Sequence, residues 1–259
     1  MDENPYESLA DLHGGEQRWA FGTGFDDPLA GLDTSVPAGI DATALACDCL
    51  GLADDALVLS QRLAQWCSNA PELEDELALA NIALDLLGQA RLLLTRAAKA
   101  DPRLRPQRAP VHVPDEDALA YYRDADEFAN LVFAELDDER DFARAMLRLQ
   151  AISAWRLAIM QRRTAASDPV LAAIATRAVM ELRYHVDYAC GWVARLSDGT
   201  DYSRDRMLDA RARLAPFMSE LDDADGATSR GRAGEHTPEL EALLAGMQSL
   251  ARAYPAATW

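Results

Sequence analysis

Residues 77–94 read LALANIALDLLGQARLLL, and this stretch constrains the fold more than any other part of the chain. Apolar residues occupy nearly the whole circumference of the helix that these letters predict, so other elements must cover it on several sides. The chain also lacks long β-branched runs with an alternating apolar pattern. We therefore expect an all-α protein in which residues 71–99 form a central helix.

Further helices with one apolar side are predicted around this one. A bundle-type apolar seam, with spacings of four and three, runs from residue 42 to residue 67 and contains Leu45, Cys49, Leu52, Ala56, Leu59, Leu63 and Trp66. Helix signals also cover residues 115–135 with a kink near 123–126, and residues 139–166, 169–196, 201–222 and 237–254. Prolines break the chain between residues 100 and 114. The pattern predicts a four-helix bundle with additional helices over residues 42–259.

Residues 1–41 differ from the rest of the chain. Glycines and prolines punctuate this segment, and no apolar periodicity survives in it. We interpret it as a loop-rich N-terminal extension. Trp19, Phe21 and Phe25 could dock it onto the domain or onto a partner, and a loose tail is the alternative.

Charge and composition restrict the partners. The formal net charge of −18 argues against nucleic acid and anionic membranes. Of the 25 basic residues Lys99 alone is lysine, a bias that we attribute to genome composition. We expect neither a secretory signal nor a membrane-spanning segment. The four cysteines form no CxxC pair, which fits a reducing cytoplasm.

Glu181 and His185 raise the question of a metal centre. They lie four residues apart, so a helix would place them on one side, as in bundles that hold two iron ions. Such a site needs a Glu-x-x-His motif on each of two helices, but Tyr184 stands at the expected histidine position. The other histidines, His13, His112 and His236, fall in the extension or in loops. We therefore predict no metal ligand and no catalytic residue in this chain.

A buried polar core is the interpretation that remains for Glu181 and His185. On the preceding helix Asn81, Asp85 and Gln89 follow a line at spacing four, and Asp85 is followed three residues later by glycine rather than histidine. A buried carboxylate needs a partner. Asp85 could pair with one of three residues, and the sequence does not choose among Arg91, Arg183 and His185. We predict that Asn81, Asp85, Glu181 and His185 form a degenerate polar core where a related enzyme would hold metal.

Three segments resemble a known family. They are DDALVLSQRLAQWCSNAPELEDELALANIALDLLGQARLLL at 54–94, ELRYH at 181–185 and WVARLSDGTDYSRDRM at 192–207. Together they resemble the C subunits of bacterial phenylacetyl-CoA 1,2-epoxidases, over residues 42–222. The resemblance implies a ferritin-like bundle within a multicomponent, NADPH-dependent oxygenase that acts in aerobic phenylacetate degradation. It also implies that a homologous catalytic A subunit holds the di-iron centre, while the C subunit is structural and holds no cofactor.

Two other functions stay open at this point. A self-contained ferritin-like di-iron oxidase would need ligands that the sequence does not offer. A helical module could also serve as a scaffold for another acyl-CoA oxygenase, or bind a partner outside any oxygenase. Trp155, Trp192, Tyr121 and Tyr122 are candidates for an interface with the A subunit or another oxygenase component, although such aromatics more often lie in the core.

Overall fold

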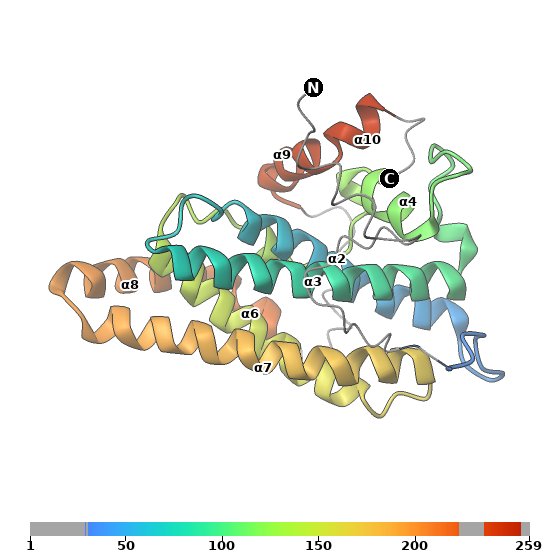
Figure 1. Ribbon diagram of the computed structural model, residues 1–259, viewed down its shortest axis with the longest axis horizontal. Coiled ribbons are helices and arrows are strands. Elements are labelled where there is room, and N and C mark those ends of the chain that lie inside the picture. The colour runs from blue at the N-terminus through green and yellow to red at the C-terminus, as the bar shows by residue number, and fades with distance from the viewer. Residues whose placement is uncertain (1–28, 30, 223–235, 255–259) are drawn as a thin grey trace, which may run out of the picture.

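The computed structural model describes residue 29 and residues 31–222 and 236–254 (Figure 1). Four long helices form its body: α2 (Ala42–Ala64), α3 (Leu73–Ala100), α6 (Phe142–Arg163) and α7 (Pro169–Asp198). No strand occurs in these ranges. The predicted all-α class is confirmed, and the four long helices end within a few residues of the predicted positions.

The starts of these helices follow from local sequence. The Asp41 carboxylate accepts hydrogen bonds from the backbone N–H groups of Thr43 and Ala44, and so caps α2. Asp141 caps α6 in the same way. Asp168 caps α7, where the following proline suits the first helical position.

Two antiparallel hairpins build the bundle. α2 packs against α3, α6 packs against α7, and α3 and α7 meet across the hairpins (Figure 1). A long crossover from residue 101 to residue 141 joins the two hairpins. One long crossover between two helix pairs is the connectivity of ferritin-like folds.

The crossover is not the kinked helix that we predicted for residues 115–135. It contains α4 (Asp115–Tyr121), the single turn η2 (Ala125–Glu127) and α5 (Val132–Glu135), after a first turn η1 (Pro102–Leu104). The helix ends because the buried Arg123 side chain turns inward to Asp54 on α2. The backbone N–H groups of Ala129 and Leu131 then bond to α2 carboxylates rather than to a helix.

The C-terminal elements also divide further than predicted. The stretch 201–222 is α8 (Asp201–Leu214) followed by a tighter helix, η3 (Ala215–Asp222). The last predicted helix is α9 (Pro238–Met247) followed by α10 (Ser249–Ala253). α9 packs against α2 and the crossover.

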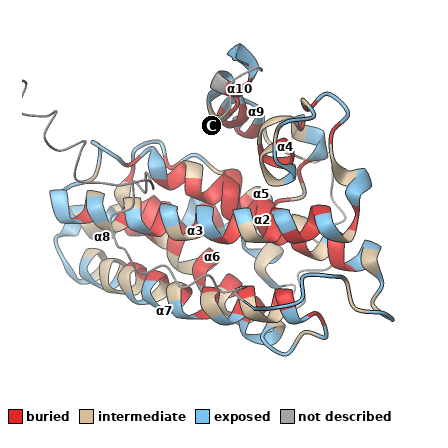
Figure 2. Ribbon diagram, turned by 45° about the vertical axis from the view of Figure 1, so that its right-hand side comes forward, coloured by how far each residue is buried: buried red, intermediate tan, exposed pale blue. Residues whose placement is uncertain are grey.

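The most enclosed helix is α2 and not α3. Every residue from 51 to 60 is buried, because α3, α5 and α9 pack around α2 (Figure 2). Among the described residues nothing covers one side of α3, where Leu77 and Leu84 are exposed. Within the described residues, 71–99 is therefore not the central helix that we predicted. An apolar circumference shows that a helix can be surrounded, but not that its own chain surrounds it.

α3 is also long and apolar enough to cross a membrane by length and composition, which we did not expect. Helices of globular cores pass the same test, and α3 packs against α2, α4 and α7. It also contains Asp85 and Gln89, whose side chains bond to α7 and α6. The described contacts are those of a bundle helix.

The described end of the N-terminal segment lies against the bundle. The carbonyl groups of Thr34 and Ser35 accept hydrogen bonds from the Arg96 guanidinium, which also pairs with Asp168. Trp19, Phe21 and Phe25 lie outside the described residues. The boundary at residue 41 therefore stays a prediction.

The four aromatic side chains considered for an interface occupy different environments. Trp155 is buried in the core, while Tyr121 and Tyr122 are half-buried. Trp192 is half-buried, stacks edge-on against Phe142 and donates a hydrogen bond to a carboxylate of α3. All four thus contribute to packing within the chain to some degree.

Candidate functional site

A buried guanidinium lies where the four long helices meet. Arg156 on α6 is fully buried, and its Nη1 atom donates to the backbone carbonyl of Leu52 on α2 at 2.8 Å. Its Nε atom donates to Oε1 of Gln89 on α3 at 3.2 Å. A buried charge is stable only when such partners replace water. Arg156 therefore ties three helices together from inside the core.

The network continues to the fourth helix. Gln89 donates through Nε2 to Oε2 of Glu181 on α7 at 2.9 Å. The second oxygen of Glu181 accepts from Nε of Arg177, one turn earlier, at 2.9 Å. Hydrogen bonds thus link all four long helices through Arg156, Gln89 and Glu181. From here on, the name polar core means these three residues and not the set that we predicted from the sequence.

Asp55 on α2 adds a carboxylate to the same region. It is buried, and its Oδ1 atom accepts from the backbone N–H of Leu131 at 2.8 Å. Burial raises the pKa of Asp55 to about 7, while the attraction of Arg156 opposes that rise. Burial likewise lowers the pKa of Arg156 to about 10, against the attraction of Asp55 and Glu181. Both carboxylates attract the guanidinium through space, but its Nη2 atom has no hydrogen-bond partner among the described residues.

Asp54, the neighbour of Asp55, faces the crossover. Its carboxylate accepts from both terminal nitrogens of Arg123, with Nη1 at 2.9 Å from Oδ2, and from the backbone N–H of Ala129 at 2.9 Å. A two-pronged arginine–carboxylate pair fixes both groups in direction as well as distance. Asp54 therefore holds the extended segment that replaces the predicted helix.

His185 is the partner of Asp85. Its Nε2 atom lies 3.1 Å from Oδ2 of Asp85, and its ring is fully buried. Of the other two candidates, Arg91 lies near Glu116 and Arg183 is exposed. The pair links α3 to α7 one turn away from the contact between Gln89 and Glu181.

The predicted polar set is therefore only partly brought together. Asp85, Glu181 and His185 lie at the contact between α3 and α7, but Asn81 is exposed and lies outside this contact. From the sequence we assigned no role to Arg156, which lies at the centre of the hydrogen bonds that link the four long helices. Its only signal was a basic residue in a predicted apolar seam, directly after Trp155.

These residues do not fit a di-iron centre. Such a centre needs carboxylates and two imidazoles that converge on the ions. Here Glu181 is bonded to Gln89 and Arg177, and Asp55 is bonded to the backbone N–H of Leu131. His185, the one fully buried histidine among the described residues, is bonded to Asp85. Among the described residues, the one group of three ligand-type side chains within 4.8 Å is the exposed Asp124, Asp126 and Glu127 of the crossover.

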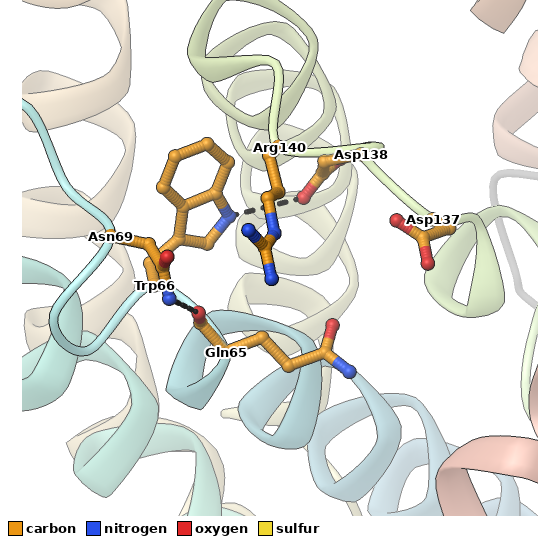
Figure 3. Close-up of a pocket in the computed structure, with 6 residues that line it drawn as sticks. All are labelled: Gln65, Trp66, Asn69, Asp137, Asp138 and Arg140. Carbon is orange, nitrogen blue, oxygen red and sulfur yellow. Dashed lines mark hydrogen bonds between the residues drawn. The ribbon is translucent and has the colours of Figure 1, made fainter.

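A small pocket opens at one end of the bundle, between the end of α2 and the start of α6 (Figure 3). Its volume is about 380 Å³, and its lining is Gln65, Trp66, Asn69, Asp137, Asp138 and Arg140. Trp66 donates through Nε1 to Asp138 at 3.3 Å, and Arg148 donates to the same oxygen at 2.6 Å. These bonds tie the end of α2 to the turn before α6.

Comparison with known proteins places the chain in a family. A family profile described as "Phenylacetic acid catabolic protein" matches residues 34–227. The chain belongs to this family. The match covers the four long helices and the crossover, so it confirms the ferritin-like bundle and the resemblance seen in the sequence.

One curated member of the phenylacetic acid catabolic family aligns closely. It is the C subunit of the 1,2-phenylacetyl-CoA epoxidase of Escherichia coli strain K12, which is 46% identical over 176 residues. The alignment covers 68% of this chain and 66% of that protein, just under two thirds of the relative's length. The name of this relative describes one part of an enzyme rather than a whole enzyme.

Proposed function

We propose that this chain is the structural subunit of a phenylacetyl-CoA 1,2-epoxidase in aerobic phenylacetate degradation, and that it pairs with the di-iron catalytic A subunit. The observation that carries the proposal is Arg156. A guanidinium, attracted by the charges of Asp55 and Glu181, occupies the centre of a bundle whose relatives include a protein named as the C subunit of such an enzyme.

The chemistry of the polar core supports a role in rigidity. Hydrogen bonds from Arg156 and Gln89 fix the spacing of the four long helices without any exchangeable ligand. A rigid bundle offers a partner a surface of fixed shape, which lowers the entropy lost on association. The chain would then hold the helices of the A subunit in the geometry that its irons require.

We also propose the cofactor content, the partners and the cellular location of the protein. We infer that the chain itself holds no cofactor, that its partners are the A subunit and other oxygenase components, and that it works in the cytoplasm. The charge of −18 supports partners other than nucleic acid or anionic lipid. Substrate would bind to the A subunit, since the polar core of this chain is filled by its own side chains.

Co-expression with the A subunit of the same organism tests the proposal. We expect the two chains to elute as one complex, with iron in the A subunit, and NADPH oxidation that depends on phenylacetyl-CoA once the reductase is added. The A subunit expressed without this chain is the control, and we expect it to be less active or less soluble. Failure of the two chains to associate, with full activity of the A subunit alone, would refute the proposal.

A further inference from the structure

On one side of the bundle, exposed apolar side chains are covered by no other described element of the chain. α3 and α7 run side by side in opposite directions on this side (Figure 1), joined by Gln89 with Glu181 and by Asp85 with His185. Large apolar side chains point outward around these contacts, with 38–71% of each exposed: Leu77, Leu84, Leu87, Met180 and Tyr184. We call these five residues, together with Gly88, the α3/α7 face. Exposed apolar side chains gathered on two neighbouring helices in this way often mark an interaction site.

Gly88 adds a second observation. It is exposed near the middle of α3, and a Cβ atom placed on it would meet nothing within 4 Å. Glycine is less favourable than alanine inside a helix, so a packing reason is expected at such a position. No neighbour within the described chain supplies one. A small residue on the outside of a helix allows the backbone of another molecule to approach closely.

The character of the surrounding residues restricts the occupant. A second copy of this chain would bring together two molecules that each carry a net charge of −18 and so repel one another. A lipid bilayer would have to accept Asp85, a partly exposed carboxylate within the face. Exposed polar residues, among them Arg91, Arg183 and Asp187, border the apolar centre. An apolar centre with a polar rim is the usual composition of a protein interface.

We propose that the α3/α7 face is the surface on which the catalytic A subunit packs, with a helix of that partner lying across α3 at Gly88. This inference rests on the proposed function, because it takes the partner from there. Packing would cover Tyr184 and the contact between Asp85 and His185, and would complete the burial of α3. It would also explain why α3 is apolar on the side that the described part of its own chain leaves open.

Two variants test the face by affinity. Leu84→Asp places a charge in its centre, and Gly88→Gln places a side chain where close approach is expected. Gly88→Gln should leave the thermal unfolding temperature of the isolated chain equal or higher, since glutamine favours helix and has space there. We expect each variant to weaken binding to the purified A subunit at least about tenfold by calorimetry, a typical effect at an interface centre. Leu208→Asp changes an equally exposed leucine on α8 and should bind like the wild type.

The outcomes separate this inference from the proposed function. If the wild type binds the A subunit and both face variants bind equally well, the face is wrong while the proposed function stands. If the wild type does not bind, both proposals fall. If the chain alone sediments as a dimer that Leu84→Asp dissociates, the occupant is a second copy and the inference is overturned. Binding of the chain alone to phosphatidylcholine vesicles, lost in Leu84→Asp, would overturn it in the same way.

Discussion

At the scale of single residues, the most informative feature is a buried arginine that bonds to other helices. Arg156 is fully buried, and its guanidinium contacts the backbone of α2 and the side chain of Gln89 on α3. Arginine suits this position because its planar group stays charged and donates in several fixed directions. A lysine would offer a single point of charge and fewer directed bonds.

Removal of Arg156 should therefore destabilise the bundle strongly. Arg156→Ala removes the buried hydrogen bonds to the Leu52 carbonyl and to Gln89, and each hydrogen bond from a charged group contributes about 1.5–3 kcal/mol. Urea denaturation followed by circular dichroism measures the change in free energy of unfolding. Arg211→Ala, on the exposed side of α8, is the control, for which we expect a change of less than about 0.5 kcal/mol. An equally small change for Arg156→Ala would contradict the assigned role.

Asp55 should give stability a specific dependence on pH. Burial raises its pKa from the ordinary value of 3.8 to about 7 in the folded chain, so the folded state binds the proton more tightly. The contribution of this group to stability is then largest below about pH 4 and is lost as pH rises towards 7. Asp55→Asn should remove this part of the slope in thermal unfolding between pH 4 and 7. Asp201→Asn, at an exposed site, should keep the wild-type slope. The idea fails if both variants give the same slope.

At the scale of elements, the carboxylates of α2 determine the shape of the crossover. The sequence between 115 and 135 favours helix locally, but Asp54 and Asp55 accept hydrogen bonds from Arg123 and from two backbone N–H groups of the crossover. These contacts join residues about seventy positions apart. Periodicity within a window cannot detect them, although two adjacent acids inside an apolar seam were a visible signal.

Asp54→Ala should loosen the crossover before the bundle. Arg123 would lose its buried partner, and the N–H of Ala129 would lose its acceptor. Hydrogen exchange measured by mass spectrometry should become faster in peptides that cover residues 122–131. Peptides from α7 should exchange as in the wild type, because Asp54 makes no described contact with that helix. Unchanged exchange at 122–131 would show that other contacts hold the segment.

The docking of α9 should weaken at alkaline pH. His236 faces two acceptors, with Nδ1 bonded to the Glu135 carboxylate and Nε2 2.9 Å from the carbonyl oxygen of Phe128, so both ring nitrogens donate when the ring is charged. Burial lowers the pKa of His236, but these two hydrogen bonds and the negative charges of Glu135 and Asp54 together raise it more.

The folded pKa of His236 therefore lies above its ordinary value of 6.5, and the stabilisation is complete below that pH and lost as pH rises through the folded pKa. Hydrogen exchange in α9, corrected for the intrinsic rate, should be more protected at pH 6 than at pH 9. His236→Gln should abolish the difference. Equal protection of wild-type α9 at both pH values would contradict a charged His236.

At the scale of the whole molecule, sequence and structure agree on the architecture. They differ on which of the long helices the other elements enclose. The apolar seams and capping residues predicted the four long helices because those signals are local. They could not decide that α2 is enclosed and α3 is open, since both are apolar around much of their surface. The arginine bias, which we attributed to genome composition, also has a structural side, because Arg96, Arg123, Arg148 and Arg156 are all buried and bonded to groups on other elements.

We claim that Arg156, with Asp55 and Glu181 near it, occupies the place of a metal centre. The iron content of the chain purified alone tests this claim most directly. The chain would be produced in iron-supplemented cells and measured by inductively coupled plasma mass spectrometry, with the co-expressed A subunit as the positive control. We predict no stoichiometric iron in this chain and iron in the A subunit. A di-iron complement, about two ions per molecule of this chain, would contradict the claim.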